Sequence, residues 1–213
     1  ASSFIAPAVQ SNLSYQKQYP LATALARPLI AKLLVEVAKK KQAQAIAHGC
    51  TAKGNDQVRF ELAIKALAPD LEIVAPAREW QMSREQEIEY ARAHNIEVPV
   101  TKSSPYSIDE NFYGRSIEAG DLEDPWVEPS PDVFKWTTDP SEAPANPEYL
   151  ELTFVNGLPT VLNEEQLSLP EMVKRLNEIG SRHGVGRLDI IEERVVGIKS
   201  REVYECPAAL ILL

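Results

Sequence analysis

The sequence lacks the residue patterns of several common protein classes. It holds only two cysteines, Cys50 and Cys206, and their separation fits no metal-binding or redox motif. Its three histidines are scattered, and no Ser-His-Asp or Cys-His arrangement for nucleophilic catalysis is recognisable. No apolar run approaches the ~20 residues of a membrane helix, and no secretory signal is seen at the start. We therefore expect free thiols in a reducing compartment, no metal site, no catalytic side chain and no membrane partner.

Positive charge is also scarce. The chain has 22 Lys and Arg against 31 Asp and Glu, so its formal net charge is -9. Binding to a nucleic-acid backbone requires clustered cations, and this balance argues against nucleic acid as the main partner. With 213 residues, 44% of them hydrophobic and 25% charged, the chain is long enough for one large or two small globular domains.

The first hundred residues alternate short apolar runs with helical patterns. The runs 43–47, 71–75 and 97–100 predict strands, and the segments 27–41, 56–67 and 83–94 predict helices. This alternation predicts a parallel, doubly wound α/β sheet, which binds ligands at the carboxyl ends of its strands. In the first helix Ile30, Leu33, Leu34 and Val37 recur at helical spacing and are predicted to form the buried face.

The following residues carry weaker signals. Residues 103–123 are polar with weak periodicity, and residues 124–147 contain six prolines, which predicts an extended connector. Its aromatic residues Trp126, Phe134 and Trp136 predict that the connector packs against a core or an interface.

The last third is predicted to be α+β. A strand at 149–154, the turn Asn156-Gly157 and a strand at 160–162 predict a hairpin. Ser168 and Glu171 predict a capped helix that ends at Gly184, so His183, like His94 in the earlier helix, is predicted to lie near a helix C-terminus. The predicted buried face of this helix consists of Leu169, Met172, Val173, Leu176 and Ile179. A second hairpin is predicted from strands at 188–192 and 195–199. We expect a nucleotide-binding α/β domain over residues 1–100 and an α+β domain over residues 101–213.

The stretch from His48 to Glu61 is the most distinctive in the chain. A predicted strand leads through a turn containing Gly49 and Gly54 into a predicted helix, a geometry that presents backbone N–H groups to an anion. The guanidinium group of Arg59 can donate two parallel hydrogen bonds to a carboxylate, and the Asp56 carboxylate can accept a hydrogen bond from an ammonium group. Spacing alone leaves a plainer interpretation open, in which Asn55 or Asp56 caps a helix and Lys53 and Arg59 are solvated helix residues. The stretch is not a Walker-type phosphate loop, because the required glycine–lysine order is absent.

This stretch resembles the signature of the argininosuccinate synthase family, the ATP-dependent ligases of arginine biosynthesis. Three other segments resemble further family motifs and follow in family order: Tyr19–Pro28, Pro105–Glu118 and Gly186–Glu205. The resemblance therefore covers nearly the whole chain. It implies the rear part of a doubly wound, parallel-sheet nucleotide-binding domain, followed by an α+β synthetase domain that binds citrulline and aspartate.

The resemblance also implies the substrates and their residues. Family members join citrulline to aspartate through a citrullyl-AMP intermediate, with ATP (and magnesium) as co-substrate and AMP and pyrophosphate as products. The matching citrulline positions are Tyr19, Thr23, Asn55, Arg59, Ser107, Ser116, Glu192 and Tyr204. The aspartate positions are Thr51, Asn55 and Asp56, and Gly49 matches an ATP-contacting position. A cytoplasmic homotetramer is implied for the complete protein.

Two of the departures from the family pattern bear most directly on binding and activity. Ala24 occupies a position where some members bind citrulline through serine, and neighbouring Thr23 is expected to compensate. The family's Ser-Gly-Gly-Leu-Asp-Thr-Ser nucleotide loop is not found, so we expect a truncated chain without ligase activity of its own. An inactive fragment or amino-acid-binding module that needs the missing segment is the alternative function, and an adenylating ligase with other substrates is a third.

Overall fold

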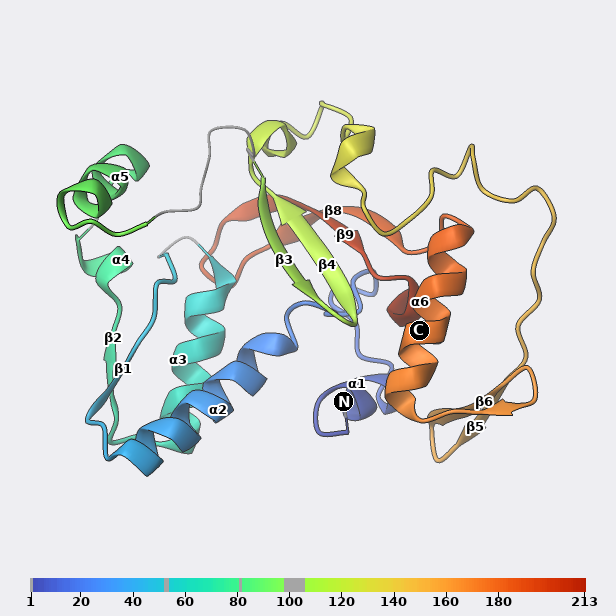
Figure 1. The fold of residues 1–213 in the computed structure, drawn as a ribbon, viewed down its shortest axis with the longest axis horizontal. Helices are drawn as coiled ribbons and strands as arrows, with labels where there is room; N and C mark the ends of the chain where they lie inside the picture. Colours follow the sequence, from blue (N-terminus) through green and yellow to red (C-terminus); the bar gives the residue numbers. More distant parts are fainter. Residues whose placement is uncertain (1, 52–53, 81, 98–105) are drawn as a thin grey trace. The chain divides into compact units, whose positions relative to one another are not determined.

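The computed structural model describes residues 2–51, 54–80, 82–97 and 106–213, which pack into two compact units. Unit 1 consists of Ala1–Ala26, Tyr106–Glu192 and Ser200–Leu213. Unit 2 consists of Arg27–Pro105 and Glu193–Lys199. Figure 1 shows the elements of both. The predicted domain boundary at residue 100 and most of the predicted strand at 97–100 lie outside the described residues, and both stay predictions.

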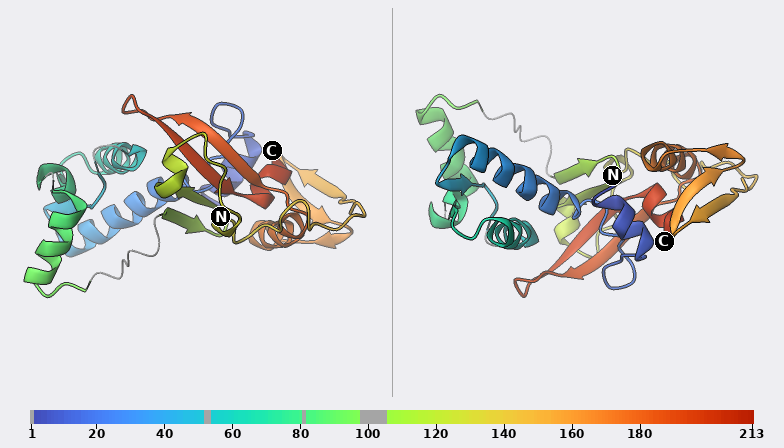
Figure 2. Two further views of the ribbon diagram at one scale, coloured as in Figure 1. Left: turned by 90° about the horizontal axis from the view of Figure 1, so that it is seen from above. Right: turned by 90° about the horizontal axis from the view of Figure 1, so that it is seen from below.

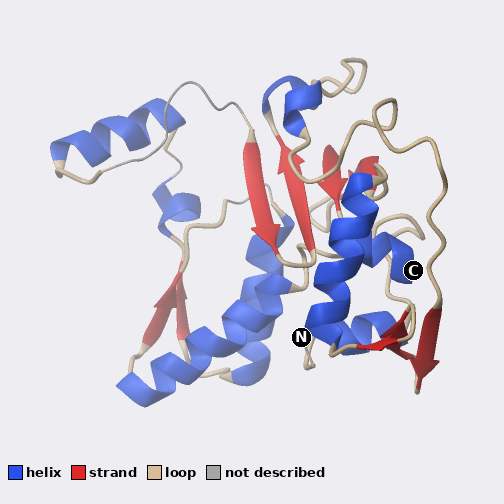
Figure 3. Ribbon diagram, turned by 45° about the vertical axis from the view of Figure 1, so that its right-hand side comes forward, coloured by secondary structure: helices blue, strands red, loops and turns tan. Residues whose placement is uncertain are grey.

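Unit 2 contains a parallel strand pair connected through a helix. Strand β1 (Ala45–Ala47) pairs in parallel with β2 (Glu72–Val74), and α3 (Asn55–Leu67) lies between them in the chain. Helix α2 (Ala26–Lys41) precedes the pair, and α4 (Pro76–Trp80) and α5 (Arg84–Ala93) follow it. This is the predicted strand–helix–strand arrangement, with strands two residues shorter than expected (Figure 3).

The buried face of α2 was predicted wrongly. Ile30, Leu33 and Val37 are 38%, 50% and 56% exposed, and only Leu34 of the predicted set packs against the core. The residues that are buried instead are Ala31, Val35 and Ala38. They contact the cluster that contains Ile46, Phe60 and Ile64. Small side chains let α2 approach its neighbours closely, so the buried face of this helix is the less hydrophobic one.

Two helix starts agree with the sequence. Ser83 and Gln86 form the predicted capping box of α5, in which each side chain bonds to the other residue's backbone N–H. Ser168 and Glu171 form the predicted box of α6 (Leu169–Arg182). The predicted buried face of α6 is confirmed, with Met172, Val173 and Leu176 fully buried and Leu169 and Ile179 packed against the same cluster.

The central feature of unit 1 is a four-stranded antiparallel-paired sheet in the order β3-β4-β9-β8. The strands are β3 (Ser107–Asn111), β4 (Gly114–Glu118), β8 (Arg187–Glu193) and β9 (Lys199–Glu205). Figure 2 shows β8 and β9 as one long hairpin. The weak periodicity at 103–123 did not predict β3 and β4, because one face of this hairpin carries polar side chains.

One predicted strand is instead the turn of the β8–β9 hairpin. Residues 195–199 were expected to pair with 188–192, but β9 begins only at Lys199 and ends at Glu205. The N–H groups of Arg194 and Gly197 bond to the carbonyls of Ile198 and Arg194, and Gly197 has φ +84°. A glycine in this left-handed conformation closes the β8–β9 hairpin, so the strand register is displaced by several residues.

A second sheet and two short helices complete unit 1. Strands β5 (Leu152–Val155), β6 (Leu158–Leu162) and β7 (Glu165–Gln166) form an antiparallel sheet. Asn156 and Gly157 both have positive φ, as the predicted hairpin turn requires. Helix α1 (Ile5–Gln10), which the sequence did not predict, and α7 (Pro207–Leu212) contribute Ile5, Ala208 and Ala209 to the main core.

The proline-rich connector is irregular apart from one 3-10 turn, Pro131–Val133, and a second 3-10 turn, Gly120–Glu123, directly precedes it. Phe134 packs against a small cluster formed by Ile117, Leu122, Val133 and Val203, as predicted. Trp126 does not pack within the unit, since it is 94% exposed.

A buried carboxylate anchors this connector to the sheet. Glu205 is inaccessible to solvent and pairs with Arg115 at 2.9 Å. Its oxygens also accept from the backbone N–H groups of Lys135, Trp136 and Thr137 and from the Thr137 hydroxyl. The charge is thus fully compensated, as a buried carboxylate requires.

None of the helices within the described ranges is both long enough and apolar enough to cross a membrane.

Candidate functional site

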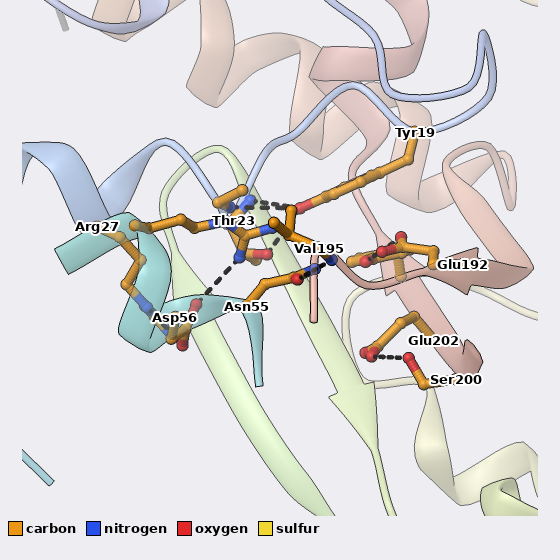
Figure 4. Close-up of polar contacts among 12 residues, drawn as sticks. Tyr19, Thr23, Arg27, Asn55, Asp56, Glu192, Val195, Ser200 and Glu202 are labelled. Carbon is orange, nitrogen blue, oxygen red and sulfur yellow. Dashed lines mark hydrogen bonds and ion pairs between the residues drawn. The ribbon is translucent and has the colours of Figure 1, made fainter. Parts of the chain in front are cut away.

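In unit 1, four of the predicted citrulline residues form one buried hydrogen-bonded cluster. The rings of Tyr19 and Tyr204 stack with centroids 3.8 Å apart and planes inclined by 13°. The Tyr19 hydroxyl lies 2.7 Å from the Thr23 hydroxyl and accepts from the Thr23 backbone N–H at 2.9 Å. The Tyr204 hydroxyl donates to Glu192. Figure 4 shows Tyr19 directed toward Thr23.

Burial dominates the electrostatics of this cluster. Desolvation raises the pKa of Tyr19 to about 12, although its hydrogen bonds with Thr23 act in the opposite direction. Desolvation also raises the pKa of Tyr204, and Tyr19 and the negative charge of Glu192 raise it further. Both phenols therefore stay protonated at neutral pH, so Tyr204 remains a donor to the Glu192 carboxylate.

The sheet register places Ser116 beside this cluster. Ser116 lies directly opposite Tyr204 across the β4–β9 ladder, and directly opposite pairs share one face of a sheet. On the neighbouring strand β3, Asp109 lies opposite Ser116, and Ser107 lies opposite Glu118. Ser107 is exposed and precedes Asp109, the β3 residue opposite Ser116, by two residues. The sequence prediction did not include Asp109 or Glu118, and recognition of the β3–β4 hairpin would have placed both on this face.

The segment 19–24 is held on the β3–β4 turn by a close backbone approach. The Asn111 side chain donates to the Ala22 carbonyl at 3.1 Å. A Cβ atom added to Gly114 would lie 2.6 Å from the Ala22 Cβ atom, so no larger residue fits at Gly114. This contact places Tyr19 and Thr23 against the sheet that carries Tyr204.

In unit 2, the predicted aspartate and ATP residues lie in the turn after β1 and the first turn of α3. Gly49 and Thr51 are exposed, and a Cβ atom added to Gly49 would meet nothing within 4 Å. Asn55 is the first residue of α3, and its side-chain oxygen accepts from the Val195 backbone N–H at 2.7 Å (Figure 4).

Asp56 joins two arginines of unit 2. Arg27 lies 2.7 Å from one carboxylate oxygen of Asp56, and Arg59 lies 3.0 Å from the other. The plainer interpretation of Asp56 as a cap is wrong, because the N-cap of α3 is Gly54 and no side chain caps the helix. Two guanidinium groups and the start of α3 make this end of unit 2 suited to a carboxylate or phosphate.

The remaining candidates are structural. His94 and His183 are the C-cap residues of α5 and α6, as their sequence positions indicated. Cys206 is buried and its pKa is raised to about 12 by desolvation, so it is not a reactive thiolate. Within the described ranges, no group of three or more His, Cys, Asp or Glu side chains could hold a metal ion.

Comparison with known proteins identifies the family. Residues 1–97 match the arginosuccinate synthase N-terminal HUP domain, and residues 106–213 match the arginosuccinate synthase C-terminal domain. The chain belongs to the argininosuccinate synthase family. Its fold is accordingly a HUP domain followed by the family's synthetase domain, with parallel and antiparallel sheets.

Curated relatives agree with this assignment. The argininosuccinate synthase of Rubrobacter xylanophilus is 60% identical over 213 residues, which are 100% of this chain and 52% of the relative. That of Dictyoglomus thermophilum is 57% identical over 210 residues (99% and 52%). That of Acaryochloris marina is 58% identical over 215 residues (99% and 54%). The chain thus spans about half the length of the curated relatives it matches.

Proposed function

We propose that this chain contributes the amino-acid-binding residues of an ATP-dependent ligase that joins citrulline to aspartate. The relatives are named argininosuccinate synthase, and family members of that name are ligases. The match to a relative extends over the whole chain. Most residues assigned from the resemblance lie together within their unit: Tyr19, Thr23, Glu192 and Tyr204 in unit 1, and Asp56 and Arg59 in unit 2.

The observation that carries the proposal is the buried carboxylate of Glu192. It is only 4% exposed and accepts from Tyr204, whose ring stacks on Tyr19. A carboxylate at the edge of an aromatic pair can bind the α-ammonium group of an amino acid through charge-assisted hydrogen bonds. Ser116, on the same sheet face, supplies a hydroxyl for the remaining polar atoms of citrulline.

In unit 2, we assign Gly49 to ATP, Thr51 and Asp56 to aspartate, and Arg59 to the citrulline carboxylate. Asn55 is assigned to both amino acids. Asp56 already carries Arg27 and Arg59 on its two oxygens, but a carboxylate has about four acceptor positions and can also accept from the aspartate ammonium. Arg59 is held by Asp56 in a geometry that leaves further guanidinium N–H groups for a carboxylate.

The proposed reaction requires no protein nucleophile. The ureido oxygen of citrulline attacks the α-phosphorus of ATP, and pyrophosphate leaves. The aspartate amine then attacks the citrullyl-AMP, and AMP leaves. Residues of this chain would act by holding the two amino acids in reactive positions and by neutralising charge. ATP, with magnesium as its counter-ion, is the co-substrate in this proposal.

The second candidate function is an amino-acid-binding module without ligase activity. The chain spans about half the length of the curated relatives it matches, and binding of the amino acids needs only the residues assigned above. The doubly wound topology, the homotetramer and the cytoplasmic location stay predictions from the resemblance.

Calorimetric titration of citrulline onto the whole chain tests the proposal. The variant Glu192→Gln should raise the dissociation constant about 10- to 100-fold, because it removes a charge-assisted hydrogen bond. Glu193→Gln, the same change at the next position, where the side chain is exposed, is the matched control and should bind like the unchanged chain.

Activity then separates the two candidate functions. Citrulline-dependent AMP formation from ATP and aspartate would show that the chain is a ligase by itself. Citrulline binding without AMP formation would favour the binding module. If the unchanged chain does not bind citrulline with or without ATP, the proposed function is wrong for this chain.

A further inference from the structure

His48, the residue that follows β1, is held rigidly below the exposed turn that contains Gly49 and Thr51. Its backbone N–H bonds to the Val74 carbonyl at 3.0 Å and thereby extends the β1–β2 ladder. Its side chain is only 6% exposed, and its ring lies within 19° of the plane of the Phe60 ring. The position of the imidazole is therefore set by the backbone bond to β2 and by packing against Phe60.

One imidazole nitrogen shapes the turn. The Cys50 backbone N–H donates to His48 Nδ1 at 3.2 Å. A ring nitrogen that accepts a hydrogen bond carries no proton, so the neutral ring must carry its proton on Nε2. This bond directs the Cys50 N–H toward the His48 ring.

The other imidazole nitrogen faces a charged pair. Nε2 is buried and has no hydrogen-bond partner among the described residues. The nearest acceptor given by the structure is Glu61 Oε1 on α3, 3.4 Å away. The same oxygen accepts from Arg78 on α4, and Arg78 also donates to Gln57. Glu61 and Arg78 are thus the charged groups that face His48, and the carboxylate favours the tautomer with a proton on Nε2.

We infer that His48 is a positioning residue that sets the backbone of the turn at Gly49–Thr51 through the bond from Cys50 N–H to its Nδ1. The negative charge of Glu61, 3.4 Å from Nε2, favours the required tautomer. The inference rests on the proposed function only in that Gly49 and Thr51 are assigned to ATP and aspartate. If His48 gained a second proton, Nδ1 would become a donor and could no longer accept from Cys50.

Two variants test the inference, one that keeps a hydrogen-bond acceptor at the Nδ1 position and one that removes it. In His48→Asn, the side-chain oxygen can take the place of Nδ1 and keep the acceptor for Cys50. In His48→Gln, the polar atoms reach toward the Nε2 position and the near acceptor is lost. Amide hydrogen exchange of the Cys50 N–H, followed by NMR on the whole chain, should be unchanged in His48→Asn and about tenfold faster in His48→Gln, as loss of one hydrogen bond implies.

The control is the amide of residue 48 itself. It bonds to Val74 in all three proteins, so its exchange should not change if the fold is kept. Equal protection of Cys50 in both variants, or equal loss in both, would overturn the inference.

The unchanged protein provides a test that needs no variant. The ¹⁵N chemical shifts of the neutral His48 ring should show an unprotonated Nδ1 and a protonated Nε2. The opposite tautomer would overturn the inference.

A binding measurement distinguishes failure of this inference from failure of the proposed function. Aspartate should bind His48→Gln more weakly than His48→Asn. If the exchange and tautomer results are as expected but the unchanged chain binds neither ATP nor aspartate, the proposed function fails and the positioning role stands. If aspartate binds all three proteins equally, His48 does not position the turn for that ligand and the inference fails.

Discussion

Helices α6 of unit 1 and α2 of unit 2 have similar apolar patterns in sequence and opposite outcomes in the structure. In α6 the patterned residues Met172 and Leu176 are fully buried. In α2 the patterned residues Leu33 and Val37 are about half exposed. Helix α6 packs against β6 and α7, whereas the core of unit 2 meets α2 through its alanines. Apolar spacing thus identifies a helix, but the partners available decide which face is buried.

The same contrast holds for charge. Unit 1 encloses Glu205 with Arg115 and four donors from the connector. Unit 2 keeps its Arg27–Asp56–Arg59 group partly exposed, with the Asp56 side chain at 31%. A closed charge network stabilises a fold only when it is complete, whereas a partly open one can still accept a ligand.

The largest expected effect comes from breaking the closed network. Glu205→Ala should lower the free energy of opening of unit 1 by about 3–5 kcal/mol, because Arg115 is left buried without its partner. Asp56→Ala should lower that of unit 2 by only about 1 kcal/mol. Native-state hydrogen exchange measures both, and Glu165→Ala, an exposed partner of Arg175, is the control in unit 1. A small effect of Glu205→Ala would remove the contrast between the units.

The helix comparison can be tested in the same way. Leu176→Ala in α6 should cost about 2–5 kcal/mol, since it leaves a cavity in a packed core. Leu33→Ala in α2 should change stability by about 0.5 kcal/mol or less, because half of the side chain is already in solvent. Urea unfolding of the two variants measures the difference. If Leu33→Ala costs as much as Leu176→Ala, the α2 face is not exposed in solution.

The open arginine group predicts an effect on binding rather than on folding. Arg59→Lys in a full-length member of the family should weaken citrulline binding by roughly 1.5–3 kcal/mol, because a point charge cannot replace the guanidinium fork. Calorimetry with citrulline measures this change. An unaltered dissociation constant would count against the role assigned to Arg59.

Alkaline pH should affect unit 1 first. Burial raises the pKa of Tyr19 and Tyr113 to about 12, and the pKa of Tyr204 is also raised. Because folding favours the neutral phenols, their contribution to stability is complete below the unfolded pKa of about 10 and is lost as the pH rises toward about 12. All three tyrosines belong to unit 1.

Urea unfolding at pH 9 to 11.5, with tyrosinate absorbance recorded in parallel, measures this loss. The variant Tyr113→Phe should lose less stability over the same range. Ionisation of these tyrosines in the folded protein near pH 10 would contradict the prediction.

Local chemistry explains what was predictable. The two capping boxes, the Asn156-Gly157 turn and the helix ends at His94 and His183 depend on residues close in sequence, and all agree with the structure. The residues of the candidate site were named from the resemblance, but their contacts were not. The stack of Tyr19 on Tyr204 and the bond from Tyr204 to Glu192 depend on a sheet register that no local pattern reveals.

The sequence by itself determined the family, the main helices and the turns. Motif order can be read directly from the sequence, and short-range hydrogen bonds depend on residues that are close in sequence. Only the tertiary structure decided that β3 and β4 pair beside β9, that α2 buries its alanines, and that His48 accepts from Cys50. These outcomes depend on which surfaces meet. Contact between distant residues is set by packing and burial, which act on the folded chain as a whole.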